Sequence, residues 1–337
     1  MTPRQRVQAA LRHEPTERIP YNFMFTPPAQ EALCRRLGVD DLQESLACHL
    51  YLYGPSGKPL YASPEEYGPR ITDEFGVTWS ASDRDRGAPI GHPLAQGTFD
   101  GYVFPDPHRA QRWETVAEAA EQYADQFRLG VIGDLWERAC FMCGIENLLI
   151  YLSIAPAFVH ELLDRLCDYN VATLEGLATF KPDGVFISDD YGFQDRLMVA
   201  PATWRTFVGP RLARMLEAAQ RHGLVSMLHS CGHVSPIVPD LIDMGLDILH
   251  PIQPEAMDVF DLKREFGTDI TFCGGISTQQ TLNRGTPEEV REEVLLKAEQ
   301  LGRGGGYILE PGITIQADVP VENMVALIQA AREYRRG

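Results

Sequence analysis

Short apolar runs alternate with helix-like segments throughout the second half of this 337-residue chain. This alternation limits the fold more than any other feature of the sequence. Five such runs occupy residues 184–188, 225–228, 247–250, 269–273 and 306–310. Glycines that favour a left-handed C-terminal cap stand where the intervening helices are expected to end, at Gly223, Gly245, Gly267 and Gly302. Consecutive strand–helix units with apolar strands predict a parallel sheet covered by helices.

Three further strands are predicted earlier in the chain, at residues 18–25, 48–53 and 129–133. Helices are predicted at residues 2–13, 29–37, 113–127 and 203–222, with a capping box at residues 286–289 and a terminal helix after Pro320. Five strands plus three give eight, which favours a (β/α)8 TIM barrel formed by a single domain, residues 1–337. A doubly wound sheet is less consistent, because no Gly-x-Gly-x-x-Gly fingerprint follows any predicted strand.

Residues 54–112 interrupt the barrel pattern in the N-terminal third. This stretch is rich in Gly, Pro, Asp and Arg, with short apolar pieces such as residues 76–80. It is too long to be a simple loop, and it predicts an irregular insertion of turns with a small β-meander. Long insertions of this kind often cover active sites, so the insertion is a candidate lid.

The predicted strands end in an unusually polar set of residues. The C-terminal ends of barrel strands meet at one mouth, where the active site lies. The polar residues at these ends are Asp189, Asp190, His229, Cys231, His250, Cys273 and Glu310. Because these residues are distant in sequence but equivalent in the barrel, their convergence is the strongest functional signal in the chain.

His229 and Cys231 are two residues apart, so extended backbone places their side chains on the same side. Imidazole and thiolate are ligands that suit zinc, and a catalytic zinc site uses three protein ligands and one open position. Cys273 lies at about the right place to complete the set, and Glu310 is the alternative third ligand. A small cysteine before two glycines also has a packing explanation, so the third ligand stays open at this point.

The remaining strand-end residues are candidates for acid–base chemistry. Asp189, Asp190 and Glu310 can manage a proton or position a substrate, and His250 is a weaker candidate, since a lone strand-end histidine is commonly a hydrogen-bonding residue. A carboxylate in an apolar strand, as at Glu310, is costly to bury unless it is hydrogen-bonded, paired with a cation or used in the reaction. Asp189 and Asp190 are adjacent in the sequence, and such a pair can also cap a loop, which is the structural alternative for both.

The composition of the chain limits the classes of partner and the cellular location that are expected. The net charge of −17 repels nucleic acid and anionic membranes. The chain contains no uninterrupted run of 18 apolar residues, so no transmembrane helix is expected. The polar N-terminus lacks the apolar core of a signal peptide, which predicts a cytoplasmic protein. Seven scattered cysteines do not form a disulfide framework. The Cys140–Cys143 pair lies in a helix-like segment and is more consistent with packing than with redox or metal chemistry. Homo-oligomer formation is left open by the sequence.

Several strings resemble the uroporphyrinogen decarboxylase superfamily, which includes cobamide-dependent methyltransferases. They are residues 187–192, 229–245, 274–279 and 305–309, together with the opening residues 2–11 and 18–20. The resemblance covers nearly the whole chain and is weakest over residues 54–112. It implies a (β/α)8 barrel with its site at the strand C-termini.

The branch of the family follows from two motifs. The decarboxylase branch carries an arginine-rich motif after the first strand, and residues 23–30 of this chain contain no arginine. The methyltransferase branch carries a His-x-Cys zinc pair, which His229 and Cys231 match. Its third ligand is a later cysteine, at about the place where this chain has Gly312 and Ile313.

The resemblance therefore implies a zinc-dependent methyltransferase that moves a methyl group between a small-molecule donor or acceptor and a corrinoid (cobamide) held by a partner protein. The alternative is a metal-independent decarboxylase or lyase acting on a small anionic substrate, for which Arg138 and Arg196 are the nearest cations. A catalytically silent binding protein is a third reading, against which the polar strand ends weigh.

Overall fold

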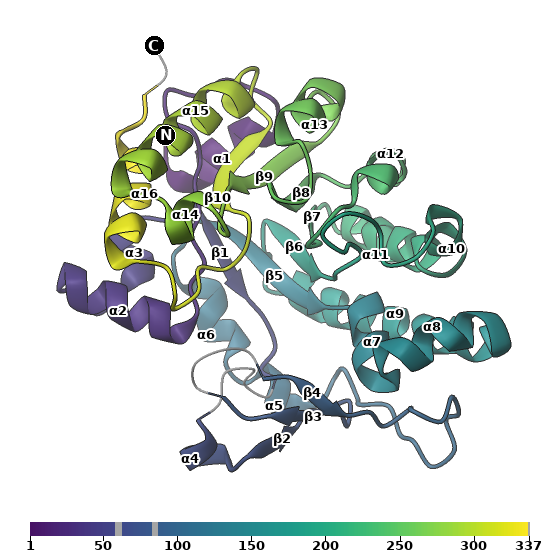
Figure 1. The fold of residues 1–337 in the computed structure, drawn as a ribbon. Helices are drawn as coiled ribbons and strands as arrows, with labels where there is room; N and C mark the ends of the chain where they lie inside the picture. Colours follow the sequence, from purple (N-terminus) through teal and green to yellow (C-terminus); the bar gives the residue numbers. More distant parts are fainter. Residues whose placement is uncertain (58–62, 83–86, 336–337) are drawn as a thin grey trace.

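A parallel sheet of seven strands forms the centre of the protein in the computed structural model, which describes residues 1–57, 63–82 and 87–335 (Figure 1). The strand order is β1-β5-β6-β7-β8-β9-β10. The strands are β1 Leu50–Tyr53, β5 Phe127–Gly133, β6 Gly184–Ser188, β7 Val225–His229, β8 Ile248–Ile252, β9 Thr271–Ile276 and β10 Tyr307–Pro311. This confirms an α/β fold built on a parallel sheet.

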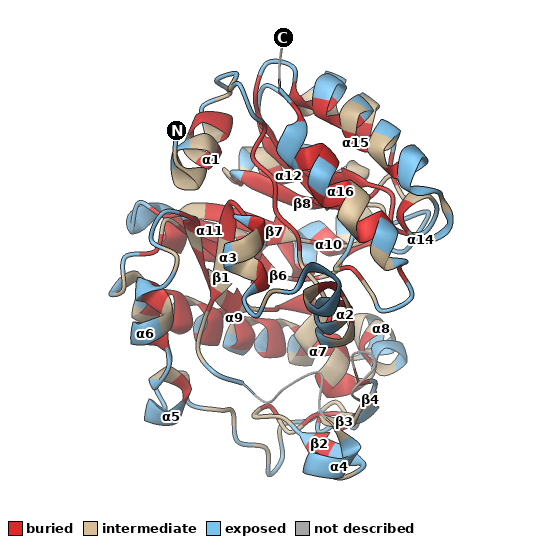
Figure 2. Ribbon diagram, turned by 90° about the vertical axis from the view of Figure 1, so that its left-hand side faces the viewer, coloured by how far each residue is buried: buried red, intermediate tan, exposed pale blue. Residues whose placement is uncertain are grey.

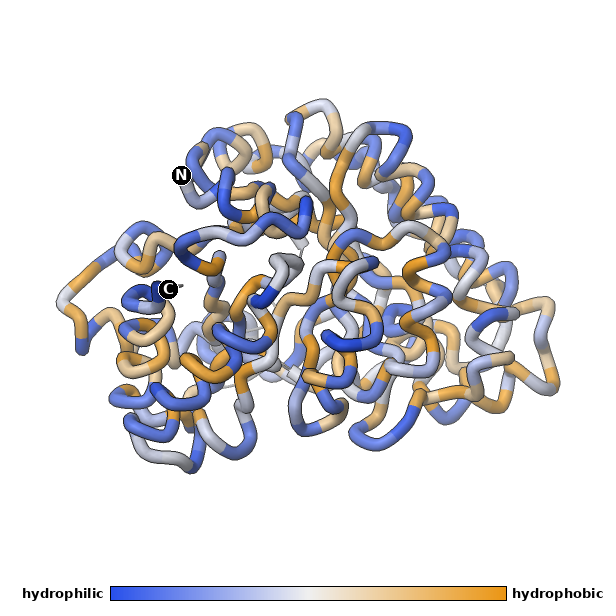
Figure 3. The backbone as a smooth tube through the Cα atoms, turned by 90° about the horizontal axis from the view of Figure 1, so that it is seen from above, coloured by the Kyte–Doolittle hydropathy of each residue, from blue (hydrophilic) through white to orange (hydrophobic). Residues whose placement is uncertain are grey.

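Helices cover the outer face of the curled sheet. In chain order the helices of the described residues are α1 Pro3–Leu11, α2 Pro27–Leu37, α3 Leu42–Leu46, α4 Pro64–Tyr67, α5 Ala110–Trp113, α6 Val116–Glu121, α7 Trp136–Cys143, α8 Ile145–Ile154, α9 Pro156–Ala178, α10 Pro201–Phe207, α11 Gly209–Arg221, α12 Val238–Asp243, α13 Val259–Phe266, α14 Thr281–Arg284, α15 Pro287–Gly302 and α16 Val321–Glu333. Two of them lie outside the outer layer: α4 packs beside β2 Arg70–Thr72, and α1 contributes to the inside of the sheet. The outer helices each have a buried and an exposed side. Their buried sides face the strands and their exposed sides face outward (Figure 2). Seen from above, hydrophilic and hydrophobic stretches alternate along these helices (Figure 3), as expected for elements with one buried face.

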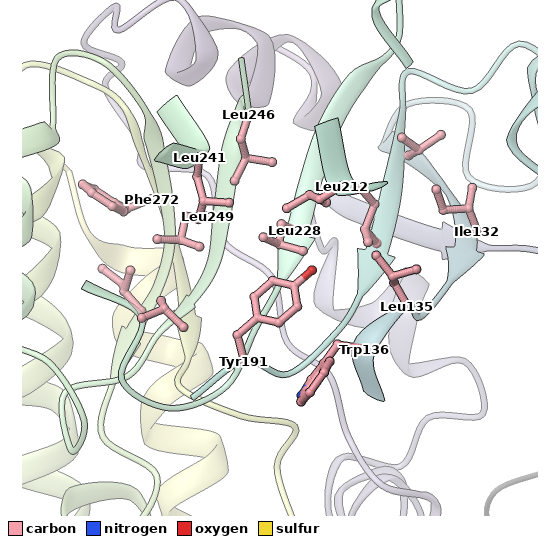
Figure 4. Packing of buried hydrophobic residues seen from close by; sticks show 14 of the residues in the cluster. Ile132, Leu135, Trp136, Tyr191, Leu212, Leu228, Leu241, Leu246, Leu249 and Phe272 are labelled. Atoms are coloured by element: carbon pink, nitrogen blue, oxygen red, sulfur yellow. The ribbon is translucent and has the colours of Figure 1, made fainter. Parts of the chain in front are cut away.

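The two faces of the sheet bury separate apolar clusters. One cluster takes residues from all seven strands, including Phe186, Met227 and Ile308, and therefore fills the inside of the curl. Val7 of α1 belongs to this cluster. The larger cluster lies between the sheet and its helices, where Leu228 and Leu249 pack (Figure 4).

The predicted strand at residues 18–25 is not a regular strand, although it lies where the eighth barrel strand is expected. Tyr21 and Phe25 form only isolated parallel bridges, to Leu309 and Ile315. The carbonyl oxygen of Tyr21 also accepts a bond from the backbone N–H of His49, just before β1. Among the described residues the parallel sheet therefore has seven regular strands, and residues 20–25 bond to β10 and to His49 as an irregular segment.

The insertion contains the predicted β-meander. Its strands β2 Arg70–Thr72, β3 Thr78–Ser80 and β4 Pro89–Gly91 form a separate antiparallel sheet in the order β2-β3-β4. This small sheet lies beside α7, on the side of the molecule toward which β5 points (Figure 1). Trp79 of β3 packs its ring edge against Phe141 of α7, which fastens the insertion to the main body.

The five C-terminal strand predictions overlap β6 to β10, and the capping box at Thr286 is confirmed. The predicted helix at 113–127 is wrong, because it breaks into α5, α6 and a turn in which Tyr123 has a φ of 49°. The predicted helix at 203–222 is divided at Val208, and the long helix α9 was not predicted.

Two of the four predicted glycine caps are confirmed. Gly223 and Gly245 have φ values of 66° and 81°. Gly267 has a φ of −70°, and Gly302 is the last residue of α15, so neither adopts the left-handed conformation.

The buried layer between sheet and helices makes a direct stability prediction. Leu228→Ala removes a side chain with no exposed surface and should lower the free energy of unfolding by about 2–5 kcal/mol, from lost burial and the cavity left behind. Urea unfolding monitored by circular dichroism measures this. Ile150→Ala on α8, where the side chain is 53% exposed, is the control and should change the value by less than about 0.5 kcal/mol.

Candidate metal centre

Polar side chains form the top layer inside the curled sheet. Successive side chains of a strand point to opposite faces, so residues two apart share a face. Met227 and Ile248 belong to the apolar interior cluster, which places His229 and His250 on the same inner face two residues further along. Glu310 follows Ile308 in the same way. The inside of the sheet is therefore apolar toward the strand starts and polar toward the strand ends.

Parallel pairing sets the neighbours in this layer. Ser188 pairs with His229, and His229 pairs with His250. Ser188, His229 and His250 therefore lie side by side at the ends of β6, β7 and β8.

Asp190, His229 and Cys231 form the first group of potential metal ligands. The Nε2 atom of His229 lies 3.3 Å from Sγ of Cys231 and 3.5 Å from Oδ1 of Asp190. A tetrahedral zinc ion with bonds of about 2.0–2.3 Å keeps its ligand atoms roughly 3.3–3.8 Å apart. Both distances from the imidazole nitrogen fit a zinc ion, and the ligand atoms of all three residues lie within 4.8 Å of one another. All three residues are partly exposed, so a fourth position is accessible from the mouth.

This group is held by the loops after β6 and β7, which cross in close contact. The backbone N–H of Cys231 donates to Oδ1 of Asp190 at 2.8 Å. A Cβ atom on Gly192 would approach the backbone N of His233 to 2.5 Å, and one on Gly232 would approach the carbonyl oxygen of Gly192 to 2.4 Å. Glycine is required at both positions, because any side chain would push the two loops apart.

Hydrogen bonds from buried side chains complete the crossing. The backbone N–H of Tyr191 donates to Oγ of Ser230 at 2.9 Å. The side-chain oxygen of Gln253 accepts from the backbone N–H of Gly232, and its amide nitrogen donates to the carbonyl oxygen of Gly312 at 2.8 Å. These bonds tie the loops after β6, β7, β8 and β10 together.

His250, Cys273 and Glu310 form a second, fully buried group. The thiol of Cys273 donates to Oε2 of Glu310 at 3.1 Å, and Nδ2 of Asn22 donates to Oε1 at 3.1 Å. Burial raises the pKa of Glu310 to about 7, and it raises the pKa of Cys273 well above its usual value, with Glu310 adding to the effect. The group therefore favours neutral side chains.

A histidine pair links the two groups. The Nδ1 atoms of His229 and His250 are 3.0 Å apart, so one of them carries the proton and the other accepts it. Burial and the neighbouring imidazole lower the pKa of His250, which keeps its ring neutral with a single proton. Its Nε2 lies 3.6 Å from Oε2 of Glu310 and has no hydrogen-bond partner among the described residues.

This arrangement ties metal binding to one tautomer. A metal at Nε2 of His229 needs the lone pair there, so the His229 proton must be on Nδ1, donating to Nδ1 of His250. The single proton of His250 is then on Nε2, facing Glu310. His250 thus contacts the imidazole of His229 from behind, and Glu310 lies 3.6 Å beyond it.

Asp189 lies outside both groups and is fully buried. Its two carboxylate oxygens accept the backbone N–H groups of Trp136 and Glu137 at 2.9 and 2.6 Å, which caps the first turn of α7 from another strand. Burial raises its pKa to about 7.

The structure brings the predicted site residues together in two groups instead of one. Of the three predicted metal ligands, His229 and Cys231 share a group with Asp190, whereas Cys273 shares one with His250 and Glu310. Sequence reasoning assigned no role to Asn22, Ser230 or Gln253, whose hydrogen bonds hold the layer in place. Of these three, Asn22 gave the clearest signal in the sequence, because it is a polar residue within an apolar segment.

A hollow of about 310 Å³ adjoins the first group. It is lined by Pro89, His92, Glu137, Cys140, Phe141, Ile145, Asp190 and Met198. Its walls therefore come from the small insertion sheet and the residue after β4, from α7 and the start of α8, and from the loop after β6. Sequence reasoning missed this hollow, because it requires α7 to fold against both the insertion and the loop of Asp190.

The two arginines considered for an anionic substrate are engaged elsewhere. Arg138 donates to Asp134 at 2.9 Å and to Asp73 at 2.8 Å, and is largely buried. Arg196 is exposed, bonds to Asp195 and lies over the ring of Phe193.

Cys140 and Cys143 are buried free thiols on α7. Burial raises the pKa of both thiols, which agrees with a packing role. Among the described residues, no helix is long and apolar enough to cross a membrane.

The chain is similar to known proteins over most of its length. A family model described as Uroporphyrinogen decarboxylase (URO-D) matches residues 71–334. A solved methyltransferase from Methanosarcina mazei covers 99% of both chains, with a TM-score of 0.76 and 20% sequence identity, and therefore has the same fold.

Curated relatives fall into two activities. The methylcobamide:CoM methyltransferase MtaA of Methanosarcina barkeri is 28% identical over 174 residues, 52% of this chain and 48% of the relative, so the match spans about half of that protein. A methylated-thiol–coenzyme M methyltransferase of M. mazei is 25% identical over 297 residues, 86% of this chain and 69% of the relative. A uroporphyrinogen decarboxylase of Pseudoalteromonas translucida is 32% identical over 220 residues, 61% of this chain and 58% of the relative.

The buried carboxyl group of Glu310 predicts a pH-dependent stability. Its pKa is about 7 in the folded protein against 4.5 for an ordinary glutamate, so its contribution is fully present below pH 4.5 and is lost as the pH rises to about 7. In metal-free protein, Glu310→Gln should remove this loss, which amounts to at most about 3 kcal/mol. Urea unfolding from pH 5 to 8 measures the difference from wild type. The same slope in both proteins would contradict the prediction, and Glu322→Gln at an exposed site is the control.

Proposed function

The chain belongs to the uroporphyrinogen decarboxylase (URO-D) family, and from this premise we propose that it is a zinc-dependent methyltransferase that works with a corrinoid protein. The observation that carries the proposal is the group of Asp190, His229 and Cys231 at the strand ends, where Nε2 of His229 lies 3.3 Å from Sγ of Cys231 and 3.5 Å from Oδ1 of Asp190, beside an open hollow. The methyltransferase names of the M. barkeri and M. mazei relatives support the same reaction class.

The metal ligands in this proposal are His229, Cys231 and Asp190. Asp190 replaces Cys273 of the sequence-based set, because the thiol of Cys273 is buried against Glu310 on the other side of the histidine pair. Zinc in such a site acts as a Lewis acid, which lowers the pKa of a bound thiol or polarises the heteroatom that carries the methyl group.

The buried residues act through the ligands. His250 and Glu310 fix the tautomer of His229, and Asp189 holds α7 against the loop of Asp190. His250 and Glu310 have exposed fractions of 0% and 2%, so they do not reach a substrate, and we assign them positioning roles in place of the catalytic roles predicted from the sequence.

Methyl transfer balances without a further redox partner. The bond between the methyl carbon and its heteroatom breaks, and the heteroatom keeps the electron pair. A Co(I) corrinoid held by the partner protein would supply the electron pair for the new bond to the methyl carbon. The corrinoid protein docks over the mouth, so this chain supplies the small-molecule site.

We also propose that residues 20–25 serve as the irregular eighth strand of a (β/α)8 barrel, because they bond to β10 and to the residue before β1.

A decarboxylase acting on an anionic substrate is the alternative, since decarboxylases occur among the relatives. That reaction needs cations that face the substrate. Arg138 is bonded to two aspartates, Arg196 lies at an exposed site, and no described lysine or arginine lines the hollow. Methyl transfer is therefore the better supported reaction.

Metal content gives the first test. Protein purified without added metal should contain about one zinc ion per chain, and His229→Ala or Cys231→Ser should abolish binding by removing a ligand. Asp190→Asn and His250→Leu should weaken zinc binding about 10–100-fold, the first by weakening a ligand and the second by freeing the His229 tautomer. Elemental analysis and chelator competition measure these values.

Cys34→Ser is the matched control, because Cys34 is a free thiol on α2 outside both groups. Zinc that is retained in both His229→Ala and Cys231→Ser would refute this site. A protein that takes up no zinc when zinc is supplied would refute the metal-dependent reaction.

Methyl transfer itself is tested with free corrinoid. The zinc-loaded protein should convert Co(I) cobalamin to methylcobalamin in the presence of a methylated donor, and Cys231→Ser should reduce the rate at least roughly a hundredfold, as the loss of an essential metal ligand implies. The absorbance spectrum of the corrinoid reports the reaction. Decarboxylation of a carboxylated porphyrinogen with no methyl transfer would favour the alternative.

A further inference from the structure

The insertion contributes one histidine, His92, to the wall of the hollow beside Asp190. His92 directly follows β4, and its Nδ1 atom lies 2.7 Å from the carbonyl oxygen of Phe141 in the last turn of α7. The backbone N–H of Leu94 donates to the carbonyl oxygen of Met142 at 2.8 Å. Carbonyl groups in the last turn of a helix have no partner within the helix, so these two bonds cap α7 and hold the imidazole in place.

The bond to Phe141 also fixes the tautomer of His92. A carbonyl oxygen can only accept, so Nδ1 carries the proton, and Nε2 of the neutral ring holds a lone pair. The Cδ2 side of the ring lies over Gly144, where an added Cβ would come within 3.3 Å of it. Nε2 has no hydrogen bond to any described residue, and the side chain is only half-buried. His92 therefore presents an unused acceptor to the hollow.

The other groups around the hollow supply almost no hydrogen-bond donors. Among the described lining residues, Glu137 and Asp190 carry carboxylates, which accept only when ionised, and no lysine or arginine is present. The thiol of Cys140 is a weak donor that stays protonated, because burial raises its pKa. The remaining lining side chains are apolar, apart from that of His92. A ligand that bonds to His92 must therefore bring its own donor.

The charges near the hollow favour a neutral ligand. In the proposed metal site the thiolate of Cys231 and the carboxylate of Asp190 balance the two charges of zinc. The guanidinium of Arg138 lies over the ring of Phe141, 5.7 Å from its centroid, and already faces two bonded aspartates and the carboxylate of Glu137. It therefore has no donors left for an anion. Mostly apolar walls make a full positive charge costly as well.

We propose that His92 determines substrate specificity: its Nε2 accepts a hydrogen bond from the hydroxyl group of a small methylated sulfur compound whose sulfur lies at the metal. The inference rests on the proposed function, which supplies the metal. Sulfur is a heteroatom that zinc polarises as a Lewis acid. The apolar walls contact the short carbon chain between sulfur and hydroxyl, and the volume of about 310 Å³ suits a molecule of this size.

Two thiols that differ in one group test this bond in the zinc-loaded full chain. 2-Mercaptoethanol carries the hydroxyl group, and 1-propanethiol has a methyl group in its place. His92→Leu removes the acceptor and should lower the preference for 2-mercaptoethanol over 1-propanethiol about three- to tenfold. His92→Gln, which keeps an acceptor oxygen, should retain part of the preference. Isothermal titration calorimetry measures both dissociation constants for each protein.

The ratio of the two dissociation constants separates recognition from folding. If His92 only capped α7, His92→Leu would change the binding of both thiols equally and leave their ratio unchanged. His108→Leu is the matched control, because His108 is an exposed histidine of the same insertion outside the hollow, and its ratio should equal that of wild type. Elemental analysis confirms equal zinc content, and circular dichroism checks the folding of each variant.

Two results would overturn the inference alone. The first is zinc-loaded protein whose preference is the same in wild type and His92→Leu. The second is tighter binding of a charged analogue, 2-mercaptoethanesulfonate or 2-mercaptoethylamine, than of 2-mercaptoethanol. A protein that takes up no zinc would instead refute the proposed function, and this inference with it.

Discussion

The parallel register of β6, β7 and β8 is the constraint on which the site depends. It places Ser188, His229 and His250 side by side on the inner face of the sheet, above an apolar layer that includes Met227 and Ile248. A shift of one residue in any of these strands would exchange the inner and outer faces. Burial of the apolar layer therefore also fixes which polar side chains meet at the mouth.

The polar layer carries a cost that its geometry reduces. Buried ionisable groups are unfavourable unless they are neutral or paired. His250 stays neutral because burial lowers its pKa, and the pKa of Glu310 is raised to about 7. Asn22 and Cys273 supply hydrogen bonds to Glu310 that require no additional charge. The layer thus supports the partly exposed ligands in front of it without burying a net charge.

Sequence reasoning predicted the repeating part of this structure and missed the irregular part. Apolar runs and glycine caps locate β6 to β10, because each depends on local periodicity. Residues 18–25 have the composition of a strand, but only their neighbours decide that they form isolated bridges. At the site, His229 and Cys231 followed from their spacing, whereas the separation of Cys273 from them depends on how three strand ends pack.

The contacts that build the two groups differ in their distance along the chain. The bonds from Cys231 to Asp190 and from Tyr191 to Ser230 span 41 and 39 residues, within one strand–helix–strand unit. The bond between Asn22 and Glu310 spans 288 residues. The bonds that hold the ligand group therefore need only one strand–helix–strand unit, whereas the support behind the group requires both ends of the chain. A fragment limited to that unit would keep the ligand residues and lose the residue that hydrogen-bonds to Glu310.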